Sequence, residues 1–167
     1  MSSSYNENDI NSLNWEEWIP TEEATLCFIR KEGRLLLINK KTGMGAGLVN
    51  APGGRIEKGE TPKEGAIRET EEEVLVTPTG LEKRAELFFQ FTDGYKLKAH
   101  VFEAGDYSGE PGSTREADPF WVDEEKIPYD RMWKDDRFWI PFMLQGIFVK
   151  GYFIFRDEEM LAFRLEG

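Results

Sequence analysis

Residues 53–76 read GGRIEKGETPKEGAIRETEEEVLV: a glycine turn, an acidic loop, and then a segment crowded with carboxylates. Within this stretch, Thr61-Pro62-Lys63-Glu64 has the pattern of a capping box. A threonine stands at the N-cap, a proline takes the first helical position, and a glutamate three residues after the cap reaches back to it. The pattern predicts a helix that begins here and carries the carboxylates that follow.

Three of these carboxylates fall on one face of the predicted helix, because Glu69, Glu72 and Glu73 are spaced i, i+3 and i+4. Like charges at this spacing repel, at a cost of roughly a few tenths of a kcal/mol per pair. A hard divalent cation would offset the repulsion, since Mg²⁺ takes oxygen ligands from carboxylates and substrate phosphates. Arg68 lies four residues before Glu72 and is expected to hold that carboxylate by a forked pair of hydrogen bonds. For such a helix taken alone, a solvated acidic face is the alternative.

The composition indicates one globular domain, since the chain has 167 residues of which 40% are hydrophobic and 13% aromatic. A net charge of -11 argues against nucleic acid polymers as partners, but not against a phosphate ligand that arrives with its own metal ion. No signal peptide and no apolar run long enough to cross a membrane is visible. The cytoplasm is therefore the expected compartment, and no membrane contact is expected.

The chain is expected to divide into an N-terminal extension, residues 1–22, and one domain, residues 23–167. Residues 1–12 are polar and are expected to be disordered. Trp15 and Trp18 lie three residues apart, which favours a short turn that packs both rings on the body of the domain.

The domain alternates short strands with two helices, which favours an α+β fold or an α/β/α sandwich. Turn residues are expected to join strands at Glu32-Gly33 and at Asp93-Gly94. A second helix is expected from the apolar stripe Phe138 to Met143, capped by Asp135 or Asp136. The predicted strand segments are residues 24–30, 34–40, 86–93, 95–104, 148–155 and 160–165, the last two forming a closing hairpin. A further strand followed by a turn is expected within residues 119–128.

The order of residues in the opening stretch resembles the signature of the Nudix hydrolases. The matching positions are Gly54, Glu60, Arg68, Glu69, Glu72 and Glu73, with five residues between the first two and seven between the second and third. Thr70 stands where an aliphatic residue is usual, and Leu75 stands where the family has the glycine that ends the helix. The resemblance implies an α/β/α sandwich with a mixed central sheet, a helix that carries the signature and a second, C-terminal helix.

From Ala24 onward the chain resembles one branch of this family, the hydrolases of oxidised purine nucleoside triphosphates. The resemblance implies that Asn50, Trp133, Asp135 and Asp136 bind the purine, and that Glu116 is a loop carboxylate near the metals. The other implied substrate-binding residues are Phe89, Phe91, Lys40, Thr25 and Met44, the last standing where the branch has an aromatic residue.

The side chains of these residues are also suited to bind a purine on chemical grounds, independently of the resemblance. Trp133, Phe89 and Phe91 can wall a flat apolar slot, while carboxylates and an amide supply hydrogen bonds to the edge of the base. Adjacent carboxylates that face one ligand share a proton, because like charges raise one pKa, so the pair Asp135-Asp136 offers a donor and an acceptor together. Capping of the second helix is the alternative role for this pair, and both roles can hold at once.

The resemblance implies a pyrophosphohydrolase that converts a nucleoside triphosphate, such as 8-oxo-dGTP or 2-hydroxy-dATP, to the monophosphate and pyrophosphate. It implies a monomer that uses Mg²⁺, with Mn²⁺ as a substitute. The expected metal ligands are the Gly53 carbonyl, Glu69, Glu72, Glu73 and Glu116. Glu73 is the first candidate to accept the proton of the attacking water and Glu116 the second, with Arg68 and Glu72 completing the catalytic group.

Two rival functions remain open at this point. One is a Nudix enzyme for another diphosphate, such as a nucleotide sugar or a dinucleoside polyphosphate, which would have no use for the Trp133-Asp135-Asp136 group. The other is a catalytically silent Nudix-like binding module. The complete set Glu69, Glu72 and Glu73 argues against silence, because a degenerate module has no need of it.

Overall fold

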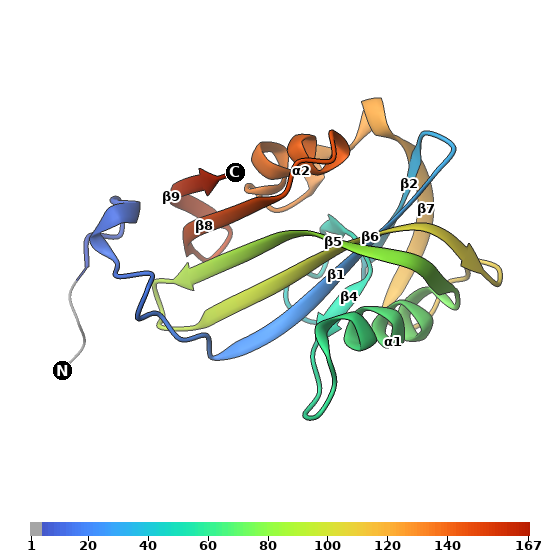
Figure 1. Ribbon diagram of the computed structural model, residues 1–167, viewed down its shortest axis with the longest axis horizontal. Helices are drawn as coiled ribbons and strands as arrows, with labels where there is room; N and C mark the ends of the chain where they lie inside the picture. Colours follow the sequence, from blue (N-terminus) through green and yellow to red (C-terminus); the bar gives the residue numbers. More distant parts are fainter. Residues whose placement is uncertain (1–4) are drawn as a thin grey trace.

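A computed structural model describes residues 5–167. The described chain forms one sheet of nine strands and two α-helices, joined by loops and short 3-10 turns (Figure 1). The strands are β1 (Glu22–Lys31), β2 (Arg34–Lys40), β3 (Val49–Asn50), β4 (Gly53–Arg55), β5 (Thr77–Phe91), β6 (Lys96–Ser108), β7 (Ala117–Asp123), β8 (Val149–Arg156) and β9 (Glu159–Glu166). The helices are α1 (Pro62–Val74) and α2 (Asp136–Leu144), and the 3-10 turns are η1 (Ile10–Ser12), η2 (Glu124–Lys126) and η3 (Tyr129–Arg131).

The sheet is mixed, as expected. Its order is β3-β2-β1-β6-β5-β8-β9, with β4 also paired to β1 and β7 to β2. The pairs β1–β6 and β5–β8 are parallel, and the remaining pairs are antiparallel. The predicted hairpins are confirmed at β1–β2, β5–β6 and β8–β9.

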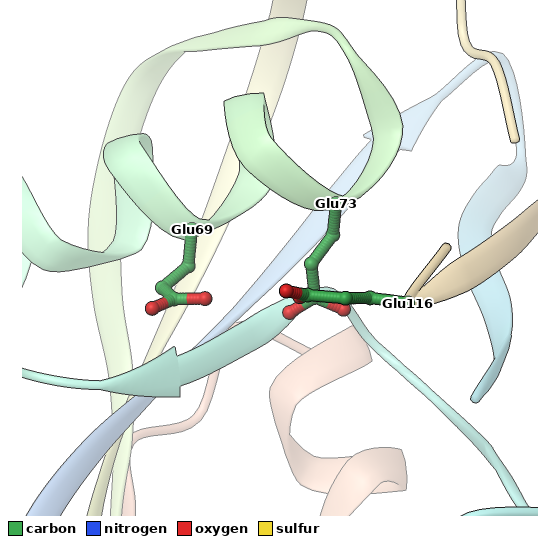
Figure 2. A group of neighbouring side chains, drawn as sticks. All are labelled: Glu69, Glu73 and Glu116. Carbon is green, nitrogen blue, oxygen red and sulfur yellow. The ribbon is translucent and has the colours of Figure 1, made fainter. Parts of the chain in front are cut away.

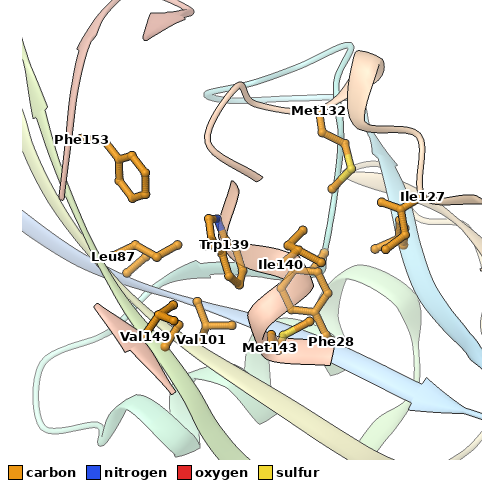
Figure 3. Close-up of a cluster of buried hydrophobic side chains, with 14 of the residues drawn as sticks. Phe28, Leu87, Val101, Ile127, Met132, Trp139, Ile140, Met143, Val149 and Phe153 are labelled. Atoms are coloured by element: carbon orange, nitrogen blue, oxygen red, sulfur yellow. The ribbon is translucent and has the colours of Figure 1, made fainter. Parts of the chain in front are cut away.

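The two helices cover opposite faces of the sheet, so the α/β/α sandwich is confirmed (Figure 1). Side chains alternate across β1: Phe28 packs with Trp139 of α2 (Figure 3), while Cys27 and Ile29 pack with Val74 of α1. Trp139 is fully buried, and removing such a ring costs about 3 to 5 kcal/mol. The two cores hold α1 and α2 against a common sheet, and the site lies among these elements.

The N-terminal segment differs from the expectation of disorder over residues 5–12. These residues form the turn η1 against β8 and β9, and Ile10 is only 8% exposed. The Nε1–H of Trp15 donates to the Ile10 carbonyl at 2.8 Å. A buried side chain and a satisfied backbone group offset the entropy cost of ordering a polar segment. Residues 1–4 lie outside the described part of the chain.

The predicted packing of the two tryptophans is confirmed. The ring of Trp15 lies 5.1 Å from that of Tyr152, and the ring of Trp18 lies 5.8 Å from that of Phe88. The Trp18 Nε1–H donates to Oε1 of Gln90 at 2.9 Å. The segment before β1 therefore covers part of the sheet face that α1 leaves open.

Within residues 5–167, neither helix is both long and apolar enough to cross a membrane.

Candidate active site

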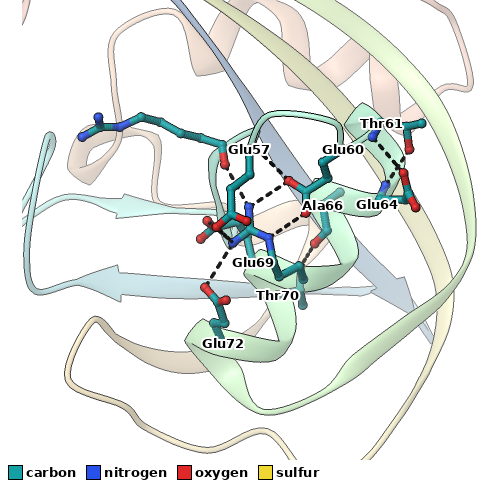
Figure 4. Close-up of polar contacts among 10 residues, drawn as sticks. Glu57, Glu60, Thr61, Glu64, Ala66, Glu69, Thr70 and Glu72 are labelled. Carbon is teal, nitrogen blue, oxygen red and sulfur yellow. Dashed lines mark hydrogen bonds and ion pairs between the residues drawn. The ribbon is translucent and has the colours of Figure 1, made fainter.

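Helix α1 begins as its sequence predicts. The Glu64 N–H donates to Oγ1 of Thr61 at 3.1 Å, and the Thr61 N–H donates to Oε1 of Glu64 at 2.9 Å (Figure 4). This reciprocal pair is the predicted capping box, with Pro62 in the first turn. The cap fixes the helical phase at which the later carboxylates leave α1.

Two glycines let the backbone of β4 approach the site closely. A Cβ on Gly53 would lie 2.0 Å from the carbonyl oxygen of Thr25, and one on Gly54 would lie 2.4 Å from the carboxyl carbon of Glu69. The Gly53 N–H then donates to Oε1 of Glu73 at 3.1 Å. Any side chain at these two positions would push β4 away from β1 and α1.

Three carboxylates from two separate parts of the chain meet beside β4. One oxygen of each of Glu69, Glu73 and Glu116 lies within 4.8 Å of the others (Figure 2). The pKa of Glu73 is raised to about 7, chiefly by burial and also by the charges of Glu69 and Glu116, while the Gly53 N–H and Lys40 act to lower it. Burial likewise raises the pKa of Glu69. Such a group of like charges, of which Glu73 is buried and Glu69 half-buried, suits a hard divalent cation with oxygen ligands.

Glu72 is not part of this group in the structure. Its side chain is 53% exposed and accepts a hydrogen bond from Nη1 of Arg68 at 3.2 Å. Glu69 and Glu73 stand one turn apart on the side facing β4, and the position of Glu72 is rotated from them toward solvent. The third carboxylate of the group comes from Glu116 in the loop before β7.

Arg68 holds a different carboxylate from the one expected. Its fork, Nε and Nη2, donates to the two oxygens of Glu60 at 2.7 and 3.0 Å, while Glu72 receives a single bond (Figure 4). The expected fork on Glu72 is wrong, because the loop before α1 folds back and brings Glu60 into the plane of the guanidinium. These bonds lower the pKa of Glu60 to about 2. Nη1 also donates to Glu69 at 2.8 Å, so Arg68 orients one of the clustered carboxylates.

A cavity of about 750 Å³ extends from the carboxylates to an aromatic wall. All the substrate-binding residues expected from the sequence line this cavity: Thr25, Lys40, Met44, Asn50, Phe89, Phe91, Trp133, Asp135 and Asp136. The ring of Trp133 meets that of Phe91 edge-on, with centroids 6.4 Å apart, and meets Phe155 at 5.6 Å. A Cβ on Gly45 would lie 2.8 Å from Nε1 of Trp133, so the glycine leaves room for the ring.

Sequence reasoning missed several residues of the cavity wall, among them Leu87, Tyr95, Leu97 and Ala99. Three of them, Leu87, Leu97 and Ala99, could have been predicted from the alternation of side chains along β5 and β6. Leu87 shares a face with Phe89 and Phe91, and Leu97 and Ala99 share the facing register on β6.

Asp135 and Asp136 lie at the aromatic end of the cavity, with only 1% and 3% of their surface exposed. Oδ2 of Asp135 accepts from Nε1 of Trp139 at 2.9 Å. Asp135 Oδ1 and Asp136 Oδ2 are buried without a hydrogen-bond partner among the described residues. Burial raises the pKa of Asp135 to about 6, and burial together with the charge of Asp135 holds the pKa of Asp136 well above its usual range.

Capping of α2 by this pair, the alternative expectation, is wrong. Asp135 occupies the N-cap position, but its side chain makes no capping hydrogen bond and its backbone is already helical, with φ -73° and ψ -29°. The carboxylate turns instead toward Trp139. A buried carboxyl oxygen without a partner is costly, so these two oxygens are suited to meet a ligand.

Comparison with known proteins agrees with this fold. The family model of the NUDIX domain matches residues 16–143, and the chain belongs to the Nudix hydrolase family. It is 41% identical over 139 residues to the oxidized purine nucleoside triphosphate hydrolase of Danio rerio, covering 83% of this chain and 89% of that one. The protein of the same name from Mus musculus is 36% identical, covering 82% and 88%. A MutT protein of Bacillus halodurans shares the fold, with a TM-score of 0.78 and 24% identity over 87% of this chain and 97% of that one.

Proposed function

We propose that the protein hydrolyses oxidised purine nucleoside triphosphates to the monophosphate and pyrophosphate, and so keeps damaged nucleotides from polymerases. The observation that carries the proposal is the position of the Asp135-Asp136 pair. Both residues, each with one carboxyl oxygen that has no hydrogen-bond partner among the described residues, line the same cavity as Glu69, Glu73 and Glu116. The names of the zebrafish and mouse relatives support the same substrate class.

The carboxylate group fits Mg²⁺, because its donors are hard oxygens and the neighbouring negative charges raise the pKa of the buried Glu73, a repulsion that a cation would relieve. Glu69, Glu73, Glu116 and the Gly53 carbonyl would hold the ion, while Glu72 lies outside the group and pairs with Arg68. Bound there, the ion would neutralise charge on the phosphate oxygens and acidify water.

The residues of the chain supply the remaining chemistry. Glu73 is placed to accept the proton of the attacking water, since the Gly53 N–H engages only its Oε1. Glu116, exposed at the opposite side of the group, is the second candidate. Arg68 keeps Glu69 in place through its bond to Oε1.

The base would lie against Trp133, with its edge toward Asp135 and Asp136. With the pKa of each carboxyl raised, the pair retains a proton near neutral pH. One carboxyl then donates to an acceptor on the base while the other accepts from a donor. Moving the shared proton from one carboxyl to the other would let the same pair form hydrogen bonds with either 8-oxoguanine or 2-hydroxyadenine.

A substrate screen tests the proposal. Pyrophosphate release with Mg²⁺ should be faster for 8-oxo-dGTP and 2-hydroxy-dATP than for dGTP and dATP. It should also exceed release of products from a nucleotide sugar or a dinucleoside polyphosphate. Preference for either of the last two would assign the chain to another Nudix activity.

Variants of Asp135 and Asp136 test whether this pair determines which base the enzyme prefers. Asp135→Asn and Asp136→Asn should lower kcat/KM unequally across 8-oxo-dGTP, 2-hydroxy-dATP and dGTP, each lost hydrogen bond costing about 1 to 3 kcal/mol. Asp130→Asn is the matched control, because Asp130 is nearby in sequence but exposed, in an ion pair with Arg137. Unchanged substrate ratios in both pair variants would refute the role given to Asp135 and Asp136.

A further inference from the structure

Glu116 differs from the other two carboxylates of the group in how it is held. Glu69 and Glu73 leave a capped helix, whereas Glu116 is an exposed residue of the loop between β6 and β7. A loop side chain far along the sequence from α1 has much conformational freedom. Its position beside Glu73 therefore needs a specific restraint.

The loop obtains this restraint from the C-terminal end of α1. The last carbonyls of a helix have no partner within the helix. In this structure the Gly112 N–H donates to the Val74 carbonyl at 3.0 Å, and Oγ1 of Thr114 donates to the Glu73 carbonyl at 2.8 Å. The loop thus takes over part of the capping of α1.

Thr114 also accepts a hydrogen bond on the same hydroxyl. The Glu116 N–H donates to Oγ1 of Thr114 at 3.3 Å, while that hydroxyl donates to the Glu73 carbonyl. One hydroxyl thus joins the backbones of two residues whose carboxylates meet in the group. Two hydrogen bonds through one atom therefore connect Glu73 and Glu116.

Lys41 fixes the same loop from its other side. Its N–H donates to the Glu116 carbonyl at 2.9 Å, and its Nζ donates to the Thr114 carbonyl at 2.9 Å. Nζ also pairs with Oδ1 of Asp118 at 2.8 Å. Lys41 thus fixes the loop, including the Glu116 backbone, from the side of β2, while the Thr114 hydroxyl ties the same residue to the end of α1.

Steric fit at Leu75 brings the loop close to the helix end. A Cβ on Gly112 would lie 3.0 Å from Cδ1 of Leu75, and one on Gly109 would lie 3.0 Å from the Leu75 carbonyl oxygen. Gly109 also has φ +95°, a conformation that favours glycine. The two glycines allow the approach that the Thr114 hydrogen bond requires.

We infer that Thr114 is a positioning residue for the metal group: its hydroxyl couples the C-terminus of α1 to the Glu116 loop and so places the Glu116 carboxylate beside Glu69 and Glu73. The inference rests on the proposed metal-dependent function. It adds a residue that touches neither the phosphates nor the ion and acts through Glu116. Partners that hydrogen-bond a metal ligand directly change metal affinity by about 10- to 100-fold when they are removed. Thr114 bonds the backbone of two ligands, so we expect an effect at the lower end of this range.

The test measures Mn²⁺ binding to the full chain without nucleotide, by the loss of the free-ion signal in electron paramagnetic resonance. Thr114→Val removes the hydroxyl at nearly constant volume and should weaken Mn²⁺ binding by about 10-fold or more. Thr114→Ser retains the hydroxyl and should bind as the wild type does. Thr114→Ala serves as the second variant without a hydroxyl if the valine disturbs folding, which circular dichroism would reveal.

Thr77→Val is the matched control. Oγ1 of Thr77 donates to Oε2 of Glu71 at 2.7 Å, so this variant also removes a hydroxyl near the end of α1, but one outside the Glu116 loop. It should leave Mn²⁺ affinity unchanged. An equal loss in Thr77→Val and Thr114→Val would mean that helix stability alone governs binding, and would overturn the inference.

A double-mutant cycle with Glu116→Gln decides whether Thr114 acts through Glu116. If it does, Thr114→Val should cost little further affinity once Glu116→Gln is present. Full additivity, or wild-type affinity of Thr114→Val alone, would overturn the inference while leaving the metal site intact. Failure of the wild type itself to bind Mn²⁺ would instead overturn the proposed metal-dependent function, and this inference with it.

Discussion

In the protein without metal, the surroundings of Glu73 oppose the charge on its carboxylate. It is a charged group with only 3% of its surface exposed, and its neighbours include two further carboxylates. Burying a charge among like charges costs stability, and a site arranged for function accepts that cost. Glu73 is therefore the residue at which activity and stability are expected to change in opposite directions.

Glu73→Gln should lower turnover by on the order of 10² or more, because it removes a negative charge and a base without removing volume. The same variant should raise the melting temperature of the metal-free protein, since one of three mutually repelling carboxylates is gone. Steady-state pyrophosphate release and calorimetry in chelator measure the two effects. Glu72→Gln should cost less activity, because Glu72 lies outside the group of three.

Glu71→Gln is the control for this substitution, since Glu71 is an exposed residue of the same helix that bonds to Thr77 and not to the group. Near-wild-type turnover of Glu73→Gln in Mg²⁺ would show that the site has been assigned incorrectly.

Asp136 makes the stability of the fold depend on pH. Its pKa in the folded protein lies above that of the unfolded chain, and Asp135 beside it titrates at about 6. As pH rises above the ordinary range of an aspartate, the unfolded chain loses these protons first. The stabilisation held by the protonated pair is complete in acid and is lost as pH rises through the folded-state values.

Asp136→Asn removes this ionisation, so its stability relative to the wild type should increase between about pH 4.5 and about pH 7.5. Urea unfolding in chelator at both values measures the difference. Asp130→Asn, at an exposed ion pair, should show no such trend. A difference that is constant or falls with pH would contradict the raised pKa of the pair.

At the scale of elements, α1 ends in a strained conformation. Leu75 follows the last helical residue with φ 66°, the left-handed region, and donates its N–H to the Glu71 carbonyl at 3.1 Å. This is the position at which the family has glycine. Its side chain is 56% exposed, so little burial offsets the strain.

Leu75→Gly should therefore stabilise the protein by about 0.5 to 1 kcal/mol, because the relief of left-handed strain exceeds the entropy that glycine adds to the unfolded chain. Chemical denaturation measures the gain. Loss of stability would mean that the contact between Leu75 and the Gly112 segment outweighs the strain.

The N-terminal segment is linked to the base pocket through one hydrogen-bonded side chain. Gln90 accepts from Trp18 and donates through Nε2 to the Phe91 carbonyl at 2.9 Å, and Phe91 lines the cavity. The Thr21 N–H also donates to the Lys96 carbonyl at 2.8 Å. The segment before β1 thus supports the end of the β5–β6 hairpin.

Trp18→Phe should raise KM for the nucleotide and lower stability by about 1 kcal/mol, because Gln90 loses its partner beside the pocket. Trp15→Phe is the matched control: it also loses one hydrogen bond, to the Ile10 carbonyl, but none that leads to the cavity.

Deletion of residues 1–12 should likewise lower the melting temperature while leaving KM and substrate ratios unchanged. A rise in KM in all three would assign the effect to stability alone.

At the scale of the whole molecule, a metal ion that binds only the folded state must stabilise it. Mg²⁺ at about 100 times its dissociation constant adds about 2.7 kcal/mol, which raises the melting temperature of a chain of this size by roughly 5 to 10 °C. Scanning calorimetry with Mg²⁺ and with chelator measures the shift. Glu73→Gln should show a much smaller shift, and a wild type without one would contradict the proposed metal site.

Features of the fold that depend on near neighbours could be predicted from the sequence. The capping box at Thr61 and Glu64, the turns at Glu32-Gly33 and Asp93-Gly94, and the closing hairpin all follow from interactions within a few residues. The spacing of the carboxylates in α1 likewise specified the family and the inventory of candidate ligands.

Which side chains meet depends on the folded chain. Of the expected carboxylates, the structure brings Glu69, Glu73 and Glu116 together and leaves Glu72 outside, and it turns the fork of Arg68 to Glu60. It also turned Asp135 away from capping and toward Trp139. The direction of a side chain at a helix end or in a loop depends on partners distant in sequence and on which polar groups burial leaves unsatisfied, and neither is encoded in local periodicity.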